Sequence, residues 1–225
     1  METQGSPNFA ARLAVLLVVA GVVAALATTF VVGFLLHRPT TTAATSNPNA
    51  QGARIHLEVV GAVSAATEFP RPGDPHPDWP AFLPTTTLKV PANSLITVQL
   101  DVADSARGLR NPFWSQAQGI VGGTFHMSYF DASGKAESGD FRALDSADDA
   151  SHTFAIPDLG VFVPLQALSP AAPPGSKNVI TFSFHTGKAG VYRWQCFVPC
   201  GQGTFAGNGG PMQTLGYMAG QLIVQ

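Results

Sequence analysis

The sequence predicts an all-β domain, an antiparallel sandwich or barrel, preceded by one membrane-spanning helix. Short runs of alternating apolar and polar residues, rich in β-branched and aromatic side chains, recur after residue 54, as in strands with one buried face. The chain holds 23 glycines and 18 prolines among its 225 residues, which favours turns between short strands over long helices. One long segment, residues 13–36, is apolar and uncharged throughout.

The membrane helix is predicted from the length of that segment. Its 24 residues cover about 36 Å at helical rise, enough to span a hydrocarbon core of about 30 Å. The alternative is a cleaved signal peptide, whose apolar core is usually only about 7–15 residues long. We therefore expect a retained anchor at 13–36, preceded by an N-terminal tail at 1–12. Arg12 and Arg38 flank its two ends, so charge does not decide its orientation.

The residues after the helix are expected to form a tether. Residues 37–53 are rich in Thr, Ala, Asn and Pro and show no apolar periodicity, which is typical of a flexible linker. The folded domain is then expected at 54–225.

Within the domain, period-two alternation places the strands. Residues 55, 57 and 59 alternate with polar neighbours, and Ile180, Phe182 and Phe184 do the same, so these side chains are expected to face the interior. Residues 110–149 are rich in Gly and Asp and show a single strand. The predicted strands are 55–59, 95–100, 124–130, 180–184, 191–196 and 222–224.

Composition limits the possible functions. Hydrophobic residues make up 45% of the chain, which is ample for a core and excludes wholesale disorder. The net charge is −2 and no cluster of Lys and Arg occurs, so we expect no nucleic-acid partner. The two cysteines, Cys196 and Cys200, are too few for a disulfide framework but sufficient for a metal site or one local bridge.

A set of soft ligands is the main functional signal. His152, Cys196 and Cys200 are joined by Met212 and Met218, which precede the last predicted strand. An imidazole, two thiolates and a thioether suit copper far better than magnesium or calcium. We expect His152 at a strand–loop junction and the other ligands in the final loop between strands, so that two β segments enclose one metal.

Each of these residues also has a purely structural interpretation. Cys196 and Cys200 can form a disulfide in an oxidising compartment, and His152 can be a hydrogen-bonded edge histidine. Met212 and Met218 can simply fill gaps in a core. The joint arrangement favours the metal site.

Two segments around the ligands carry a more specific pattern. His152-Thr153-Phe154 is followed by Pro-Asp-Leu-Gly at 157–160, and residues 190–201 are Gly-Val-Tyr-Arg-Trp-Gln-Cys-Phe-Val-Pro-Cys-Gly. In both segments the chain resembles a cupredoxin, and most of all the copper domain of cytochrome c oxidase subunit II. The resemblance implies a Greek-key cupredoxin β-sandwich with copper as cofactor. It also implies a single-pass protein of the plasma membrane, with its C-terminal domain on the extracytoplasmic side, periplasmic or extracellular.

The departures from that family are equally specific. Thr204 and Gly207 stand where the oxidase subunit has a histidine and a methionine, and Val198 replaces its glutamate. The binuclear ligand set that the family implies is therefore incomplete. Met218, followed by Ala and Gly, resembles the Met-x-Gly of single-copper cupredoxins. The implied ligands are thus His152, Cys196 and Cys200, with Met218 weak and axial and Met212 in reserve.

The favoured function is that of a membrane-anchored copper-binding cupredoxin for electron transfer. The resemblance implies an electron-transfer subunit of a cytochrome c oxidase-like complex rather than a catalyst on its own. Its redox partner is then a cytochrome or a haem–copper oxidase subunit. Phe154, Trp194 and Phe197 border the ligands as a possible apolar collar, although core packing is favoured for Phe154. Acidic residues at 145–149 are a possible steering surface.

Two other functions stay open. A copper carrier or chaperone for an oxidase usually carries a Met- and His-rich cluster, and only four methionines occur here. A metal-free structural cupredoxin domain with a Cys196–Cys200 disulfide is favoured by Thr204 in place of the histidine. Other histidines are possible recruits, of which His185 is the best placed, although the alternation directs it away from the core.

Overall fold

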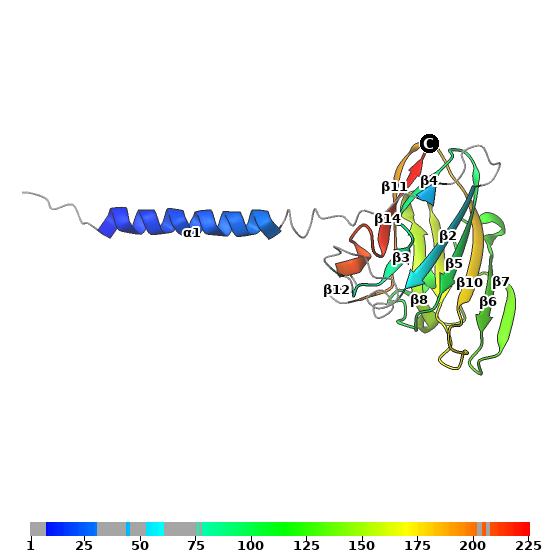
Figure 1. Ribbon diagram of the computed structural model, residues 1–225. Coiled ribbons are helices and arrows are strands. Elements are labelled where there is room, and N and C mark those ends of the chain that lie inside the picture. The colour runs from blue at the N-terminus through cyan, green and yellow to red at the C-terminus, as the bar shows by residue number, and fades with distance from the viewer. Residues whose placement is uncertain are drawn as a thin grey trace, which may run out of the picture. The chain divides into compact units, whose positions relative to one another are not determined.

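The computed structural model describes residues 8–30, 44–45, 53–60, 76, 78–201, 204–205 and 208–225. The chain divides into two compact units, Met1–Arg38 and Pro39–Gln225 (Figure 1). Each unit is described by itself below.

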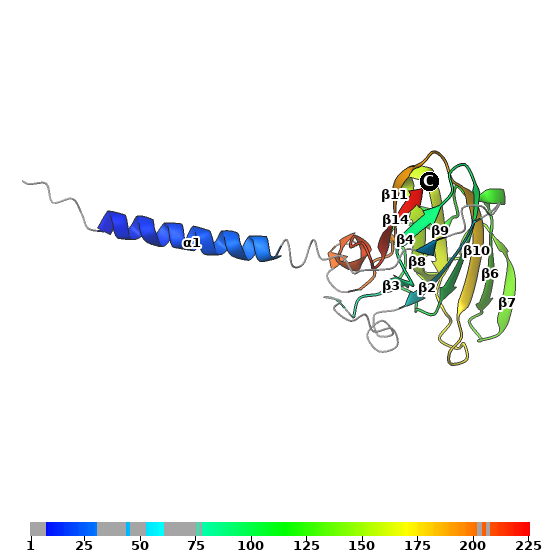
Figure 2. The same cartoon turned by 45° about the horizontal axis from the view of Figure 1, so that its top comes forward.

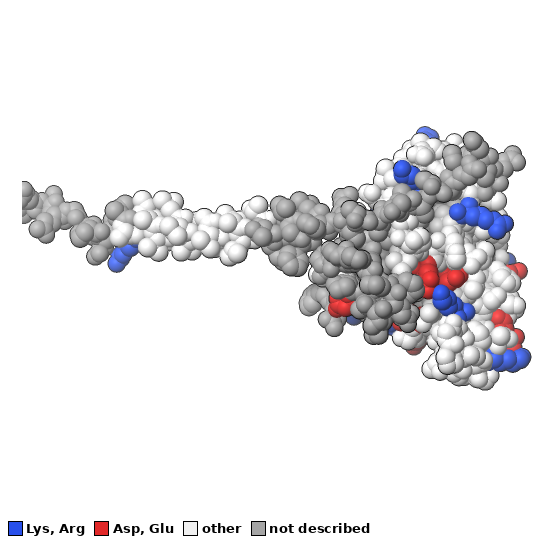
Figure 3. Space-filling view, viewed as in Figure 1, with Lys and Arg blue, Asp and Glu red and all other residues white. Residues whose placement is uncertain are grey.

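The described residues of the first unit form the helix α1 (Asn8–Phe30). Its stretch Ala11–Thr28 is long and apolar enough to cross a membrane, and its side chains are exposed on every face. Arg12 is its one charged residue, and the rest of the described helix is uncharged in Figure 3. The Thr28 hydroxyl donates to the Ala24 carbonyl at 2.8 Å, which satisfies this polar group within the helix.

The helix begins earlier than predicted, at Asn8 rather than at residue 13. The prediction placed its start at the first uncharged residue, but Ala10, Ala11 and Arg12 are good helix formers and extend the helix beyond its apolar stretch. Residues 31–36 lie outside the described residues, as does most of the predicted linker. Within the predicted flexible linker, Ala44–Thr45 forms the short strand β1, which pairs in parallel with β4 (Thr87–Val90).

The second unit is a two-sheet β-sandwich, as predicted (Figures 1 and 2). One six-stranded sheet has the order β1-β4-β14-β11-β8-β9. Besides β1 and β4 its strands are β8 (Ala150–Ile156), β9 (Val161–Gln166), β11 (Gly190–Gln195) and β14 (Ala219–Val224).

The other six-stranded sheet has the order β3-β2-β5-β10-β6-β7. Its strands are β2 (Ala53–Val60), β3 (Ala81–Leu83), β5 (Leu95–Val102), β6 (Phe125–Phe130), β7 (Ala136–Phe141) and β10 (Asn178–His185). A third, two-stranded sheet joins β12 (Thr204–Phe205) to β13 (Asn208–Gly209).

The connections are of the Greek-key type. The chain crosses from β4 to β5, from β9 to β10 and from β10 to β11, and each crossing changes sheet. The pairs β2–β5 and β4–β14 are parallel, whereas the sequence suggested antiparallel pairing throughout. Alternation of side chains predicts which face of a strand is buried, but it carries no information on strand direction.

The core confirms the predicted alternation. In β10, Ile180 and Phe182 lie opposite Leu100 and Val98 of β5, and all four side chains are buried between the sheets. The intervening side chain of Thr181 lies on the outer face and is only partly buried. Residues 55, 57 and 59 of β2 are buried in the same way.

Several strands were missed, for two physical reasons. In β8 all seven residues are buried, so the strand shows no alternation of apolar and polar residues. The edge strand β7 has the sequence Ala-Glu-Ser-Gly-Asp-Phe, in which every residue but the last has low strand propensity, and it is fixed by its pairing with β6.

Candidate metal centre

His152 is the third residue of β8 and lies within the strand rather than at the predicted strand–loop junction. Its side chain is fully buried. A register shift between Ala150 and His152 in the pairing with β9 marks a β-bulge at this point. β-Bulges change the direction in which side chains point. Here the bulge lies where the His152 imidazole points toward the loop after β11.

The two cysteines lie on that loop, directly after the end of β11. The Cys196 backbone N–H donates to the Met218 carbonyl at 2.8 Å, which continues the pairing of β11 with the segment that leads into β14. Gly201 follows Cys200 with a φ of 73°, and a side chain there would meet Pro80 and Pro211 within 3 Å. Only glycine fits at this position, where the chain turns close to the two prolines after Cys200.

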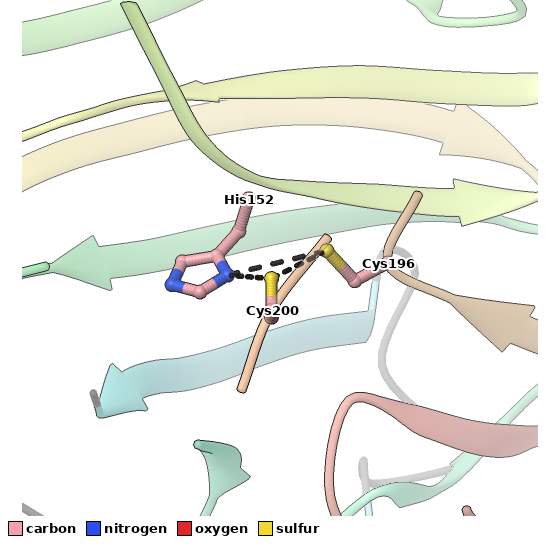
Figure 4. Close-up of side chains that lie close together, drawn as sticks. All are labelled: His152, Cys196 and Cys200. Atoms are coloured by element: carbon pink, nitrogen blue, oxygen red, sulfur yellow. Dashed lines mark hydrogen bonds between the residues drawn. The ribbon is translucent and has the colours of Figure 1, made fainter. Parts of the chain in front are cut away.

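The three predicted ligands converge in the interior (Figure 4). His152 Nδ1 lies 3.0 Å from Cys200 Sγ and 4.0 Å from Cys196 Sγ, and the two sulfur atoms are 3.5 Å apart. Ligands of one ion with bonds of about 2.0–2.3 Å lie roughly 3.3–4 Å from each other. Two of the three separations lie in this range, and the Nδ1–Cys200 Sγ separation of 3.0 Å is a few tenths of an ångström shorter. A small outward shift of one side chain would let all three atoms bind a single soft metal ion.

Backbone N–H groups surround the first sulfur. Those of Thr153 and Val198 each donate to Cys196 Sγ at 3.4 Å. The Thr153 hydroxyl in turn accepts from the Phe197 N–H at 2.8 Å, which ties the cysteine loop to β8. These donors stabilise negative charge on Cys196 and fix its position.

The protonation states of the two thiols differ. Burial raises the pKa of Cys196, but hydrogen bonds with Cys200 and His152 outweigh burial and hold the pKa well below its ordinary value. Burial and the adjacent Cys196 raise the pKa of Cys200 well above its ordinary value. These shifts favour one thiolate and one thiol in the metal-free pair, and neither cysteine is in a disulfide.

The other nitrogen of the imidazole has a partner that sequence reasoning missed. His152 Nε2 lies 3.0 Å from Asp104 Oδ2, from a segment that follows β5 in the opposite sheet. Burial lowers the pKa of His152, but the hydrogen bonds to Asp104 and Cys196 raise it to about 9. Burial raises the pKa of Asp104, yet its hydrogen bond and charge interaction with His152 lower it overall.

The two methionines are both buried. Met218 is joined to the cysteine loop through its carbonyl, and its N–H donates to the Pro211 carbonyl at 3.0 Å. Gly220 is the glycine of the Met-x-Gly pattern, and its position has no room for a side chain. A side chain there would meet the Thr86 carbonyl at 2.0 Å and the Trp194 ring at 2.5 Å.

The aromatic residues near the ligands divide into two groups. Phe154 and Trp194 are fully buried and stack with ring centroids 5.0 Å apart, so both belong to the core, as favoured for Phe154. Phe197 is only partly buried and packs against Phe162 at 5.3 Å and Trp114 at 6.1 Å.

The other histidines predicted as possible ligands, which are His56, His76, His126 and His185, lie elsewhere in the described part of the chain. His76 stacks on Trp79 with ring centroids 3.8 Å apart. His56 pairs with Asp101, His126 pairs with Asp140, and His185 is exposed at the end of β10. Thr204 forms part of β12, and Gly207 lies outside the described residues.

The strand order defines a two-sheet β-sandwich, and this centre lies between β8 and the loop after β11. No protein-family model matches the chain, and no curated protein sequence matches it. Among solved structures, auracyanin B is 12% identical, with a TM-score of 0.30, over 84% of this chain and 96% of its own.

A mutant of rusticyanin is 14% identical over 82% of each chain, with a TM-score of 0.27. A haem–copper terminal oxidase dimer contains a chain that is 14% identical, with a TM-score of 0.29, over 96% of this chain and 97% of its own. Because these TM-scores lie below 0.5, the fold class rests on the strand order described above.

Proposed function

We propose that this protein is a membrane-anchored copper-binding cupredoxin that transfers electrons. The observation that carries the proposal is the buried triangle of His152 Nδ1, Cys196 Sγ and Cys200 Sγ. Two thiolates and an imidazole form a donor set that prefers copper among redox-active metals. When bound, copper supplies one-electron redox chemistry.

The surroundings of the ligands support electron transfer over copper delivery. A carrier must release its ion, which favours exposed and mobile ligands. Here all three side chains are fully buried, and Cys196 is fixed by the N–H groups of Thr153 and Val198. A rigid, water-excluding ligand set changes little between two oxidation states, which is what rapid electron transfer needs.

An apolar path leads from the centre toward the surface. Phe197 follows Cys196 directly and packs against Trp114, which contacts Phe113 at a centroid distance of 4.9 Å. Phe113 is 55% exposed. We propose that a redox partner, a cytochrome or a haem–copper oxidase subunit, approaches here. Because Phe113 is an exposed aromatic side chain, we propose apolar contact as the basis of recognition there.

The proposed setting is the extracytoplasmic side of the plasma membrane. The proposed organisation is a tail (1–12), an anchor (13–36), a linker (37–53) and the copper domain (54–225). Protease added outside intact cells is expected to degrade the copper domain and leave the anchor in the membrane. Recovery of a soluble chain that begins near residue 45 would instead identify a cleaved signal peptide.

The function is tested on the full-length chain purified in detergent. After reduction and copper loading, we expect one copper per chain and, in the oxidised state, an intense visible thiolate-to-copper charge-transfer band. Cys196→Ser should abolish the band, Cys200→Ser should shift it, and Met218→Leu should mainly change the reduction potential. His185→Ala serves as the control because His185 is exposed and lies outside the centre.

Absence of copper uptake by the freshly reduced chain would overturn the proposal. Ready oxidation of Cys196 and Cys200 to a disulfide under the same conditions would favour the metal-free structural domain. Rapid transfer of copper to a competing chelator, without a stable band, would favour the carrier.

A further inference from the structure

Asp104 lies just beyond the end of β5 and is absent from the proposed ligand set. Its Oδ2 atom lies 3.0 Å from His152 Nε2, whereas the two sulfur atoms lie near the other ring nitrogen, Nδ1. The Asp104 side chain is 11% exposed and that of His152 is 0% exposed, so water competes little for this bond.

The carboxylate is held firmly in place. Asp104 Oδ1 accepts from the Ser105 N–H at 2.8 Å, and the Asp104 backbone carbonyl accepts from the Leu168 N–H at 3.0 Å. Farther along the segment, the N–H groups of Arg107 and Gly108 both donate to the Ala150 carbonyl at 3.0 Å. The segment that carries Asp104 is therefore bonded to β8 two residues before His152.

A nearby cation offsets the buried negative charge. Arg107 Nε lies 3.7 Å from Asp104 Oδ2, and the arginine side chain is 37% exposed. Without Arg107, the negatively charged Asp104 carboxylate would lie near two sulfur ligands with no compensating charge on its solvent side. The guanidinium supplies that positive charge.

We propose that Asp104 is a positioning residue of the metal centre: it accepts the Nε2–H of His152 and thereby directs the Nδ1 lone pair toward Cys196 and Cys200. An imidazole binds metal through one nitrogen, and the hydrogen bond made by the other decides which one is available. This inference rests on the proposed function, since it assigns a role within the same centre.

The chain supplies a matched control for this role. Asp101, in β5 and three residues before Asp104, contacts His56 Nε2 through Oδ2, also at 3.0 Å. His56 is not part of the triangle, so substitution of Asp101 removes a carboxylate–imidazole pair without touching the proposed ligands.

The test uses cadmium alone, a soft ion visible by NMR, bound to the full-length chain in detergent. In the wild type, we expect ¹¹³Cd coupling to Nδ1 of His152 and a slowly exchanging Nε2 proton. Asp104→Ala should lose this slow exchange and bind cadmium about 10–100-fold more weakly. Asp104→Asn retains an acceptor oxygen and should recover most of the affinity, while Asp101→Asn should match the wild type.

Coupling of cadmium to Nε2 would overturn the assignment, as would equal affinity and equal Nε2 proton exchange in the wild type and Asp104→Ala. If Asp104→Ala does not fold, the wild-type spectrum still decides between Nδ1 and Nε2. A wild-type chain that binds no cadmium would instead overturn the proposed function itself, and the role of Asp104 with it.

Discussion

Two aspartates near the end of β5 each bind a histidine through the same atoms at the same distance. Asp101 Oδ2 lies 3.0 Å from His56 Nε2, and Asp104 Oδ2 lies 3.0 Å from His152 Nε2. The first pair is at the surface, where His56 is 62% exposed, and the second lies in the interior. The surface pair joins neighbouring strands of one sheet, whereas the buried pair connects the two sheets.

Because the two distances are equal, burial and not distance determines how much an aspartate–histidine pair contributes to the protein. Water screens the surface pair and can replace either partner, so its contribution to stability is small. In the interior neither partner has a substitute, and the pKa of His152 rises to about 9. The buried imidazole also has a second task, since its Nδ1 faces two sulfur atoms.

The largest expected effect is the loss of one partner from the buried pair. Asp104→Ala should lower the free energy of unfolding of the metal-free chain by about 3–5 kcal/mol, because it leaves a buried charge without its partner. Asp101→Ala should cost at most about 1 kcal/mol. Urea unfolding followed by tryptophan fluorescence measures both, since Trp194 is fully buried in the core. Equal losses would mean that burial does not separate the two pairs.

The pH dependence of metal binding sharpens the comparison. Below about pH 9, His152 carries a proton on both nitrogens, and the raised pKa of Cys200 keeps its thiol protonated. A metal ion must displace the Nδ1 proton and the Cys200 proton, so affinity falls as pH falls.

For two displaced protons, the affinity for cadmium should rise up to about 100-fold per pH unit between pH 6.5 and 8.5, or about 2.7 kcal/mol. Above about pH 9 only the Cys200 proton remains, and the slope should halve. Competition titrations against a chelator measure the slope, and His56→Ala should leave it unchanged. A flat profile would show that the centre is not protonated as described.

A smaller effect is expected from buried and surface threonines. Thr153→Val removes the acceptor of the Phe197 N–H and should cost about 1–3 kcal/mol of unfolding free energy. Thr97→Val removes a hydroxyl pair with Ser183 on the outer face of the other sheet and should cost less than about 1 kcal/mol. Circular dichroism melts of the two variants compare them directly, and a reversed order would contradict the proposed anchoring of the cysteine loop by Thr153.

The contrast between buried and exposed positions also explains which strands could be predicted from the sequence. The faces of β2, β5 and β10 were predictable because their outer side chains meet water and are polar, as Thr181 and Ser183 are. The strand β8 carries no such signal, since both of its faces are covered, and His152 was therefore placed at a junction instead of inside a strand.

The candidate ligands could be predicted from the sequence, whereas their partner Asp104 could not. His152, Cys196 and Cys200 stand out because their residue types are rare in this chain and their local pattern is specific. Asp104 is one of many acidic residues, 48 positions from His152 in the sequence. Only the packing of one sheet on the other brings the two together, and no local pattern encodes that contact.

The central claim is that a buried imidazole and two thiols form one copper site. X-ray absorption at the copper edge, on the full-length chain in detergent loaded with copper, tests it most directly because it identifies the atoms bound to the ion. We predict sulfur and imidazole nitrogen as ligands, with the sulfur contribution reduced in Cys200→Ser and lost in the double variant Cys196→Ser, Cys200→Ser. Copper bound only to oxygen and nitrogen in the wild type, or a spectrum unchanged in the double variant, would contradict the claim.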